Sequence, residues 1–190
     1  KTFFVSGAGG SIGAEITRQL LSANPKKIIL YELSEYCLFQ IERECIAIIK
    51  SKGLNTSIIP ILGDIRDQKN LDYIFQKFQV DHIYHAAAYK HVPIVEDENN
   101  LSIAAENNIL GTYNLAQSAV ENSVQSFVMI STDKAVRPTN IMGATKRFAE
   151  IIIQSINAST DVTSFSMVRF GNVINSSGSV IPLFLDQISH

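Results

Sequence analysis

Three features of this 190-residue chain predict an α/β fold, in which helices cover both faces of a doubly wound parallel sheet. Short apolar runs alternate with longer stretches whose apolar residues recur at helical spacing. The connections between them are short, as is typical of parallel sheets whose strands are joined by helices. Hydrophobic residues make up 46% and charged residues 18% of the chain, ordinary values for a protein with a buried core.

The apolar runs give the expected order of the elements. Strands are expected at residues 2–6, 28–31, 57–62, 82–85, 127–130 and 164–168. Helices are expected at residues 12–20, 38–53, 71–78, 93–120 and 143–156. The fourth helix is expected to break near Asn99 and Asn100. No internal repeat, low-complexity segment or linker interrupts this alternation.

The two ends of the sequence indicate a piece of a longer protein. Strand-like residues follow Lys1 at once, and the apolar pattern at residues 181–188 stops midway. We expect residues 1–172 to form one domain and residues 173–190 to begin a further, incomplete region.

Charge and cysteine content argue against several classes of protein. The net charge is −2 and both signs are mixed along the chain, so no nucleic-acid or membrane-surface footprint is expected. No apolar run approaches membrane-spanning length, and no signal peptide is expected. Cys37 and Cys45 lie eight residues apart in a helical pattern, which favours packed core thiols in a reducing compartment over a metal site or a disulfide.

A glycine-rich loop directly follows the first expected strand. It reads Gly7-Ala-Gly-Gly-Ser-Ile-Gly13, with glycines at positions 7, 10 and 13. The first glycine permits a tight turn, Gly10 lets the backbone approach a pyrophosphate, and the third allows close contact between helix and strand. Phosphates would lie at the helix N-terminus, near Ser11 and Ile12, where N–H groups and the helix dipole favour anions. An ordinary glycine-rich turn is the alternative, but strand, loop and helix follow in the order that predicts a Rossmann-like dinucleotide site. We therefore expect residues 1–172 to be a dinucleotide-binding domain and residues 173–190 to begin an incomplete substrate-binding region. The fold is thus expected to be truncated before most of its substrate domain.

Three further strand ends supply candidate contacts for the cofactor. Glu32 closes the second strand, where an acid can bond the adenosine ribose hydroxyls and repel a 2′-phosphate, which favours NAD over NADP. A solvated charge at a strand end is the alternative for Glu32. Asp64 follows the third strand and could face the adenine amino group, and small residues end the fourth strand. The expected contacts at these ends are Glu32, Asp64, Ile65, Ala86, Ala87 and Ala88.

Proton-transfer groups gather after the fifth expected strand. Within four residues the chain offers the hydroxyl of Thr132, the carboxylate of Asp133 and the amine of Lys134, and Lys146 follows on the next helix. Ligands of open α/β sheets bind at the carboxyl ends of the strands, so we expect these groups to act on a substrate. The alternative is a surface ion pair after a strand.

The glycine spacing resembles the short-chain dehydrogenase/reductase superfamily, especially its extended branch that acts on nucleotide sugars. Members carry Tyr-x-x-x-Lys on the reactive helix, whereas this chain has Met142 and Lys146 at those positions. A spacing of four puts both side chains on one helix face, so we expect them to point into one pocket. A thioether cannot transfer a proton, which argues against a plain reductase or epimerase mechanism. Asn108 resembles the structural asparagine after the fourth strand; a polar helix residue without a role is the alternative.

Longer matches are more specific. Residues 85–93, 131–136, 138–147 and 168–173 look like the polysaccharide-biosynthesis group of UDP-N-acetylglucosamine 4,6-dehydratases. The resemblance covers essentially the whole chain, and methionine at position 142 is similar to the long, membrane-anchored members. It implies NAD as cofactor, a UDP-sugar as substrate, a homo-oligomer, a cytoplasmic location and a possible membrane anchor outside this chain.

The same resemblance implies an internal redox cycle. The sugar is oxidised at C4 by NAD+, loses water across C5 and C6, and is reduced at C6 by the NADH that was formed. Asp133, if protonated, would give its proton to the leaving hydroxyl, and Lys134, if neutral, would remove the C5 proton. Thr132 would bond the 4-oxygen and Lys146 the nicotinamide ribose. Either Asp133 or a water held by Thr132 would take the 4-hydroxyl proton.

Further residues are expected to contact the substrate. The expected substrate contacts are Lys90, Thr132, Asn172, Ser177 and Ser179, whereas Arg137 and Arg147 are expected to be solvated.

Two other functions stay open. One alternative is an NAD-dependent nucleotide-sugar epimerase or oxidoreductase, which needs no acid–base pair for C5 and C6. The other is a catalytically silent nucleotide-binding module, which has no need of intact proton-transfer groups.

Overall fold

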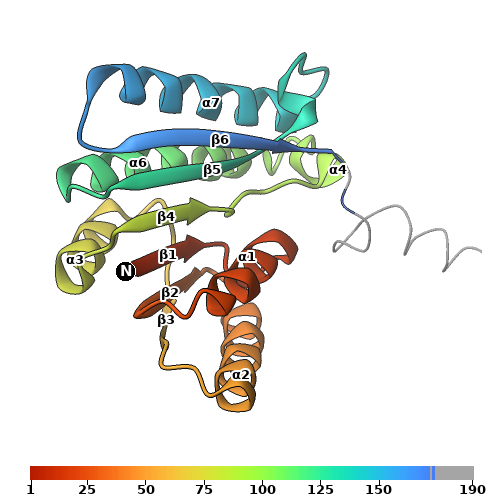
Figure 1. The fold of residues 1–190 in the computed structure, drawn as a ribbon. Coiled ribbons are helices and arrows are strands. Elements are labelled where there is room, and N and C mark those ends of the chain that lie inside the picture. The colour runs from red at the N-terminus through yellow and green to blue at the C-terminus, as the bar shows by residue number, and fades with distance from the viewer. Residues whose placement is uncertain (172, 174–190) are drawn as a thin grey trace, which may run out of the picture.

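The computed structural model of the protein describes residues 1–171 and 173. Its centre is a parallel sheet with the strand order β3-β2-β1-β4-β5-β6 (Figure 1). The strands are β1 (Thr2–Ser6), β2 (Lys27–Glu32), β3 (Ser57–Leu62), β4 (His82–His85), β5 (Ser126–Thr132) and β6 (Ser164–Phe170). The chain winds from β1 to one edge and from β4 to the other, which confirms the doubly wound arrangement.

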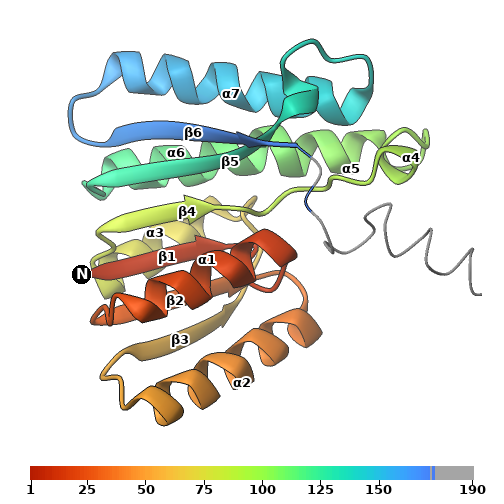
Figure 2. The same cartoon turned by 45° about the vertical axis from the view of Figure 1, so that its right-hand side comes forward.

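Helices cover both faces of this sheet (Figure 2). On one face α1 (Ser11–Ser22) and α2 (Glu35–Lys52) pack against each other and against the strands from β1 to β3. On the other face α3 (Gln68–Phe78), α6 (Gly111–Glu121) and α7 (Ile141–Ser159) lie side by side. The candidate site lies at the carboxyl ends of the strands.

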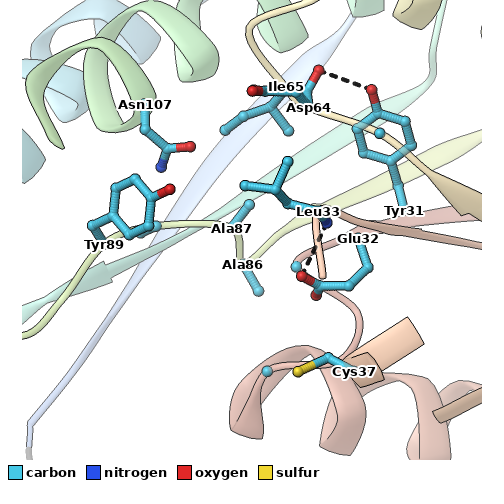
Figure 3. A pocket seen from close by; sticks show the side chains of 14 residues that line it. Tyr31, Glu32, Leu33, Cys37, Asp64, Ile65, Ala86, Ala87, Tyr89 and Asn107 are labelled. Carbon is cyan, nitrogen blue, oxygen red and sulfur yellow. Dashed lines mark hydrogen bonds between the residues drawn. The ribbon is translucent and has the colours of Figure 1, made fainter. Parts of the chain in front are cut away.

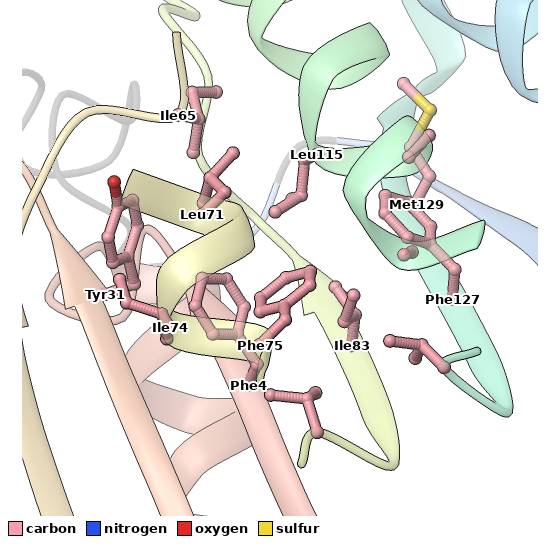
Figure 4. Packing of buried hydrophobic residues seen from close by; sticks show 14 of the residues in the cluster. Phe4, Tyr31, Ile65, Leu71, Ile74, Phe75, Ile83, Leu115, Phe127 and Met129 are labelled. Carbon is pink, nitrogen blue, oxygen red and sulfur yellow. The ribbon is translucent and has the colours of Figure 1, made fainter. Parts of the chain in front are cut away.

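Two apolar clusters hold the layers together. Beneath α3, α6 and α7, Phe4 packs edge to face on Phe75 with 5.0 Å between ring centres (Figure 4). Beneath α1 and α2, Leu30 packs with Leu38 and Cys45. Each fully buried large apolar side chain stabilises the fold by about 1.5–3 kcal/mol relative to an exposed one. The strand ends are thus presented from a closely packed base.

The strands lie where the apolar runs predicted them. β1, β3 and β4 have the expected bounds, whereas β2, β5 and β6 extend further. β5 and β6 pair in register as far as Thr132 opposite Phe170, so the ladder reaches into the polar segment after the apolar run. The sequence pattern stops at the last apolar residue, but the hydrogen-bonded ladder does not.

The expected long helix at residues 93–120 is divided into four segments. They are α4 (Val92–Val95), α5 (Leu101–Ala105), the π-helical turn η1 (Glu106–Leu110) and α6. Between α4 and α5, Asp97 accepts hydrogen bonds from Asn99, and the Asn100 amide donates to the Ile94 carbonyl. Such local bonds compete with the helix and explain the predicted break. The π turn was not predicted from the sequence.

The two cysteines differ in their surroundings. Cys45 is a core thiol as expected, and burial raises its pKa to about 12. Cys37 is only half-buried and lines a cavity, so the expectation of a second core thiol was wrong. Among the described residues there is no helix with the length and apolar character needed to cross a membrane, and no cluster of side chains that could hold a metal ion.

Candidate functional site

A cavity of about 200 Å³ lies at the carboxyl ends of the strands (Figure 3). Residues from the ends of β1 to β4, from α2 and from η1 line it. They are Gly7, Gly10, Tyr31, Glu32, Leu33, Cys37, Gly63, Asp64, Ile65, Ala86, Ala87, Ala88, Tyr89 and Asn107. Every contact expected at the ends of the second, third and fourth strands is therefore brought to one cavity.

The glycine loop packs closely against the end of β4, and this packing leaves no room for side chains at Gly7 and Gly13. Gly7 has a φ of +66°, and a Cβ atom there would lie 2.6 Å from the backbone nitrogen of Ala87. A Cβ atom on Gly13 would collide with the Gly7 carbonyl. The turn is thereby pressed against the tip of β4. Gly10 lines the cavity, whereas Ser11, Ile12 and Gly13 form the first turn of α1 behind it.

The start of α1 has the features of an anion site. Gly10, its N-cap residue, offers no side-chain acceptor, and the first turn contains no acidic residue. The first N–H groups of a helix have no intrahelical acceptor and carry partial positive charge. This end of α1 therefore fits a phosphate group of a dinucleotide.

Glu32 is held rigidly at the rim of the cavity. Its carboxylate accepts the backbone N–H of Gly9 at 2.9 Å, of Leu33 at 3.0 Å and of Ser34 at 3.1 Å. The bond from Gly9 joins the end of β2 to the glycine loop, and the bond from Leu33 helps to orient the carboxylate (Figure 3). A carboxylate has about four acceptor positions, so it can still accept from a ligand hydroxyl.

Asp64 is engaged by a neighbouring arginine. Its carboxylate lies 2.9 and 3.0 Å from Nε of Arg66, and this pairing holds the pKa of Asp64 below its ordinary value. The Asp64 carbonyl accepts the Tyr31 hydroxyl at 2.9 Å. Both bonds fix the loop after β3, and Ile65 beside it is buried in the cavity wall.

Asn108 connects three elements around the cavity. Its Oδ1 accepts from the Tyr89 N–H at 2.9 Å, and its Nδ2 donates to the Tyr89 carbonyl at 3.0 Å and to Thr145 Oγ1 at 3.1 Å. The side chain thus ties the segment after β4 to η1 and α7. Its neighbour Asn107 in η1 is also buried and lines the cavity.

A buried histidine continues this network toward the core. Thr112 Oγ1 donates to the Asn108 carbonyl at 2.7 Å and lies 2.9 Å from Nε2 of His85. Since the Thr112 proton is used, Nε2 of His85 carries its own proton, and Nδ1 accepts from Ser6 Oγ at 2.7 Å. Burial, with a smaller effect of Lys146, lowers the pKa of His85 to about 3, so the ring is neutral.

The expected proton-transfer groups meet at the end of β5. Thr132 Oγ1 donates to Asp133 Oδ1 at 3.0 Å, and Lys134 Nζ lies 3.3 Å from the same oxygen in the short helix η2 (Asp133–Ala135). These contacts, that of Thr132 first, hold the pKa of Asp133 below its ordinary value. The lowered pKa favours the ionised carboxyl, so the expected donation, which depends on a protonated Asp133, requires that Asp133 first take up a proton.

Lys146 and Met142 do not share an open pocket. Lys146 is buried and donates from Nζ to the Ile130 carbonyl at 2.8 Å. Burial lowers its pKa to about 8. Met142 packs instead with Val95 and Ala104, which come from α4 and α5. The spacing of four correctly predicted that Met142 and Lys146 share a helix face, but Val95 and Ala104 cover the thioether of Met142.

One buried carboxylate near this loop was not anticipated. Glu150 of α7 is fully buried and accepts from Ser131, Arg147 and Arg169. Arg147 was expected to be solvated; it is half-exposed and pairs with Glu150 at 2.9 Å. Glu150 lies four residues after Lys146, a spacing that placed both on one helix face and was available as a signal.

The expected substrate residues are only partly described by the structure. Lys90 lines a second cavity of about 320 Å³, next to the first and sharing Tyr89 with it. Its other walls come from α4 and α5, including Ile94 and Ile103. Asn172, Ser177 and Ser179 lie outside the described residues. The residues of the first cavity that were not anticipated are Tyr31, Leu33, Cys37, Gly63, Tyr89 and Asn107.

Curated proteins with three different names are similar to this chain. It is 50% identical to the capsular polysaccharide biosynthesis protein CapD of Staphylococcus aureus, over 99% of this chain and 31% of that protein. It is 36% identical to a UDP-N-acetylglucosamine 4,6-dehydratase (inverting) of Campylobacter jejuni, over 100% of this chain and 54% of the other. A UDP-glucose 4-epimerase of Rickettsia canadensis is 33% identical, over 99% and 53% respectively. The chain thus spans about a third to a half of these relatives.

Solved structures share the fold. Pen from Bacillus thuringiensis superposes with a TM-score of 0.88 at 36% identity, over 100% of this chain and 56% of that one. DesIV from Streptomyces venezuelae, a dTDP-glucose 4,6-dehydratase solved with NAD and TYD bound, has a TM-score of 0.79 at 25% identity, over 100% and 62%. A family model described as "Polysaccharide biosynthesis protein" matches residues 3–190. The chain therefore belongs to this polysaccharide biosynthesis protein family.

Proposed function

We propose that this chain is the NAD-binding part of a nucleotide-sugar 4,6-dehydratase that acts on UDP-N-acetylglucosamine in surface polysaccharide biosynthesis. The observation that carries the proposal is the contact of Thr132, Asp133 and Lys134 at the end of β5. Dehydration needs both a proton donor for the C6 oxygen and a proton acceptor for C5, and this loop supplies the two groups side by side. The relatives named as UDP-N-acetylglucosamine 4,6-dehydratases support the assignment.

The cavity fits NAD by its chemistry. The start of α1, whose N-cap residue Gly10 has no side chain, suits the pyrophosphate, and the fixed carboxylate of Glu32 suits the adenosine ribose hydroxyls while disfavouring a 2′-phosphate. Asp64, held by Arg66, is proposed to lie near the adenine. Bound NAD would supply a reversible hydride acceptor to this site. Domain limits of 1–172 and 173–190 remain part of the proposal.

The ionised state of Asp133 suggests one route for two protons. A carboxylate can accept the 4-hydroxyl proton as C4 is oxidised, directly or through the Thr132 hydroxyl that already donates to it. Asp133 then carries the proton that the departing C6 hydroxyl requires. In this order it acts first as base and later as acid, which replaces the phenol missing at position 142.

Two lysines complete the proposed site. Lys134 is proposed to remove the C5 proton, which the neighbouring 4-ketone acidifies. Lys146 is proposed to contact the nicotinamide ribose, and the buried ammonium adds positive charge beside the loop. Met142 takes no part in proton transfer in this proposal, because its thioether is packed among apolar side chains.

A product assay separates this proposal from the second candidate. The relatives named UDP-glucose 4-epimerase favour an epimerase as that candidate. Full-length protein given UDP-N-acetylglucosamine without added NADH should form a 4-keto-6-deoxy sugar. A 4-epimer would assign the protein to the epimerase class, and absence of turnover with retained NAD binding would favour a silent module.

Self-association and location are also part of the proposal. α6 and α7 lie side by side and expose large apolar side chains, among them Tyr113, Phe148 and Ile151. We propose that a second copy of the chain covers them; sedimentation of the full-length protein tests this. A cytoplasmic site and an anchor outside this chain, both implied by the resemblance, are tested by membrane fractionation.

A further inference from the structure

The buried carboxylate of Glu150 joins the ends of two strands to α7. Its Oε1 accepts from Ser131 Oγ at 2.7 Å and from Arg169 Nε at 2.8 Å. Its Oε2 accepts from Arg169 Nη2 at 2.7 Å and from Arg147 Nη1 at 2.9 Å. Burial raises the pKa of Glu150, but the hydrogen bonds, that from Arg169 first, outweigh it and lower the pKa to about 2. The side chain is therefore an ion at neutral pH.

The burial of the Glu150 carboxylate is better explained by a role in orienting neighbouring groups than by a gain in the stability of the fold. Taking a carboxylate out of water costs several kcal/mol, and even well-paired buried ions often add nothing over apolar side chains. A bidentate pair between an arginine and a carboxylate adds fixed geometry. The relevant question is therefore which groups Glu150 orients.

The groups that Glu150 holds border the proton-transfer loop. Ser131 and Arg169 face each other in the register of β5 and β6, one pair before the sheet ends. Ser131 directly precedes Thr132 and Asp133 in the chain. Lys146 lies one helical turn before Glu150 on α7. A single carboxylate thus ties the start of the loop to the helix that carries Lys146.

A second contact fixes the other end of the same loop. A Cβ atom on Gly143 would lie 2.5 Å from the carbonyl oxygen of Lys134, so the first turn of α7 touches the loop backbone directly. Asn140 caps this turn by accepting from the Gly143 N–H at 2.7 Å. The loop is held against α7 near both ends, at Ser131 through Glu150 and at Lys134 through Gly143.

We infer that Glu150 is a positioning residue, which fixes the position of the Thr132–Asp133–Lys134 loop relative to Lys146. Its consequence for turnover rests on the function proposed above. Arg147 provides a control, because it donates a bond of 2.9 Å to Glu150 from α7 itself rather than from the loop. If Glu150 serves stability alone, removing its bond from Ser131 or its bond from Arg147 should change kcat to a similar extent. If it positions the loop, only removal of the bond from Ser131 should lower kcat strongly.

Kinetics of three variants of the full-length protein test this. Ser131→Ala and Glu150→Gln should each lower kcat by about 10- to 100-fold with NAD affinity and KM within twofold, since small misplacements of reacting groups have effects of this size. Arg147→Gln should retain kcat within twofold. The double variant Ser131→Ala/Glu150→Gln should lose no more than Glu150→Gln alone, because both remove one connection. Equal kcat losses in Ser131→Ala and Arg147→Gln, or an additive double variant, would overturn the inference.

The pH profile supplies a readout that a purely structural role would not move. Lys146 is faced by Glu150 from its own helix, by the neutral His85 from β4 and by the Ile130 carbonyl from β5. Glu150 raises the pKa of Lys146, so Glu150→Gln should displace the alkaline limb of kcat to lower pH. An unmoved limb would contradict the placement of Glu150 beside Lys146.

Amide hydrogen exchange tests the positioning independently of the reaction. Exchange at residues 131–136 should be faster in Ser131→Ala and Glu150→Gln than in wild type and unchanged in Arg147→Gln. If this pattern is found in a protein that does not dehydrate UDP-N-acetylglucosamine, the proposed function fails and the positioning role stands. If dehydration is found but exchange in Ser131→Ala equals wild type, the positioning role fails alone.

Discussion

The hydroxyl of Thr132 donates to the carboxylate of Asp133, with 3.0 Å between Oγ1 and Oδ1. This contact is the largest of those that hold the pKa of Asp133 below its ordinary value. A carboxylate held in this way suits the acceptance of a proton, and after that step it is a proton donor. The relationship connects the first and the later proton transfers of the proposed dehydration.

Replacing Asp133 by asparagine should remove both transfers. The amide has nearly the same shape but cannot take up a proton, so kcat should fall by about 10²- to 10⁴-fold, the usual contribution of general acid–base catalysis. NAD affinity should be unchanged because Asp133 does not line the cofactor cavity. Steady-state kinetics and NAD titration measure the two effects. Activity within tenfold of wild type would assign the proton path to another group.

Lys134→Ala should abolish exchange of the C5 proton with solvent. Lys134 is the amine of the loop, and in D2O the wild-type enzyme should place deuterium at C5, detectable by NMR of the sugar. The control is Arg137→Ala, which removes an exposed cation from the same loop and should leave exchange unchanged. Exchange that survives in Lys134→Ala would show that Lys134 is not the base.

Two glycines with similar backbone angles should respond differently to alanine. Gly7 and Gly53 both have positive φ, +66° and +60°, but a Cβ atom meets the Ala87 backbone only at Gly7. Gly53→Ala should cost about 1–2 kcal/mol of unfolding free energy from strain alone and keep NAD affinity. Gly7→Ala should cost more and weaken NAD at least tenfold. Urea unfolding and NAD titration compare them, and unchanged NAD affinity in Gly7→Ala would separate this turn from the cofactor.

His85 should make the fold sensitive to acid. Its pKa is lowered to about 3 in the folded protein by burial, whereas the unfolded chain takes up the proton near the ordinary value of 6.5. Stability from this residue is therefore complete above pH 6.5 and is lost as the pH falls toward 3, by about 3 kcal/mol at pH 4. His85→Gln keeps a donor for Thr112 without titrating in this range, so it should lose about 3 kcal/mol less than wild type between pH 7 and pH 4. Equal losses in urea unfolding would contradict the buried neutral ring.

The sequence was sufficient for the sheet and for one side of the site. Apolar runs and the glycine loop predicted the strands, and strand ends in a parallel sheet meet at one edge whatever the detailed packing. Glu32, Asp64 and the alanines after β4 could therefore be assigned to one cavity without coordinates.

The remaining part of the site depends on contacts between distant segments. Helix spacing placed Met142 and Lys146 on one face, but Val95 and Ala104 decide that the thioether is covered. The spacing of four put Glu150 on the same helix face as Lys146, but the arginine that pairs with the buried carboxylate, Arg169, reaches it from β6, a contact that the local sequence does not indicate. Asn107 lines the cavity from a π turn that apolar periodicity does not reveal.

The fate of the hydrogen on C4 tests the central claim most directly. UDP-N-acetylglucosamine deuterated at C4 is incubated with full-length protein, and the product is analysed by mass spectrometry and NMR. An internal redox cycle predicts a 4-keto-6-deoxy product that carries the deuterium at C6. Deuterium returned to C4 of an epimer, or a 4-keto product whose C6 carries no deuterium, would contradict the account.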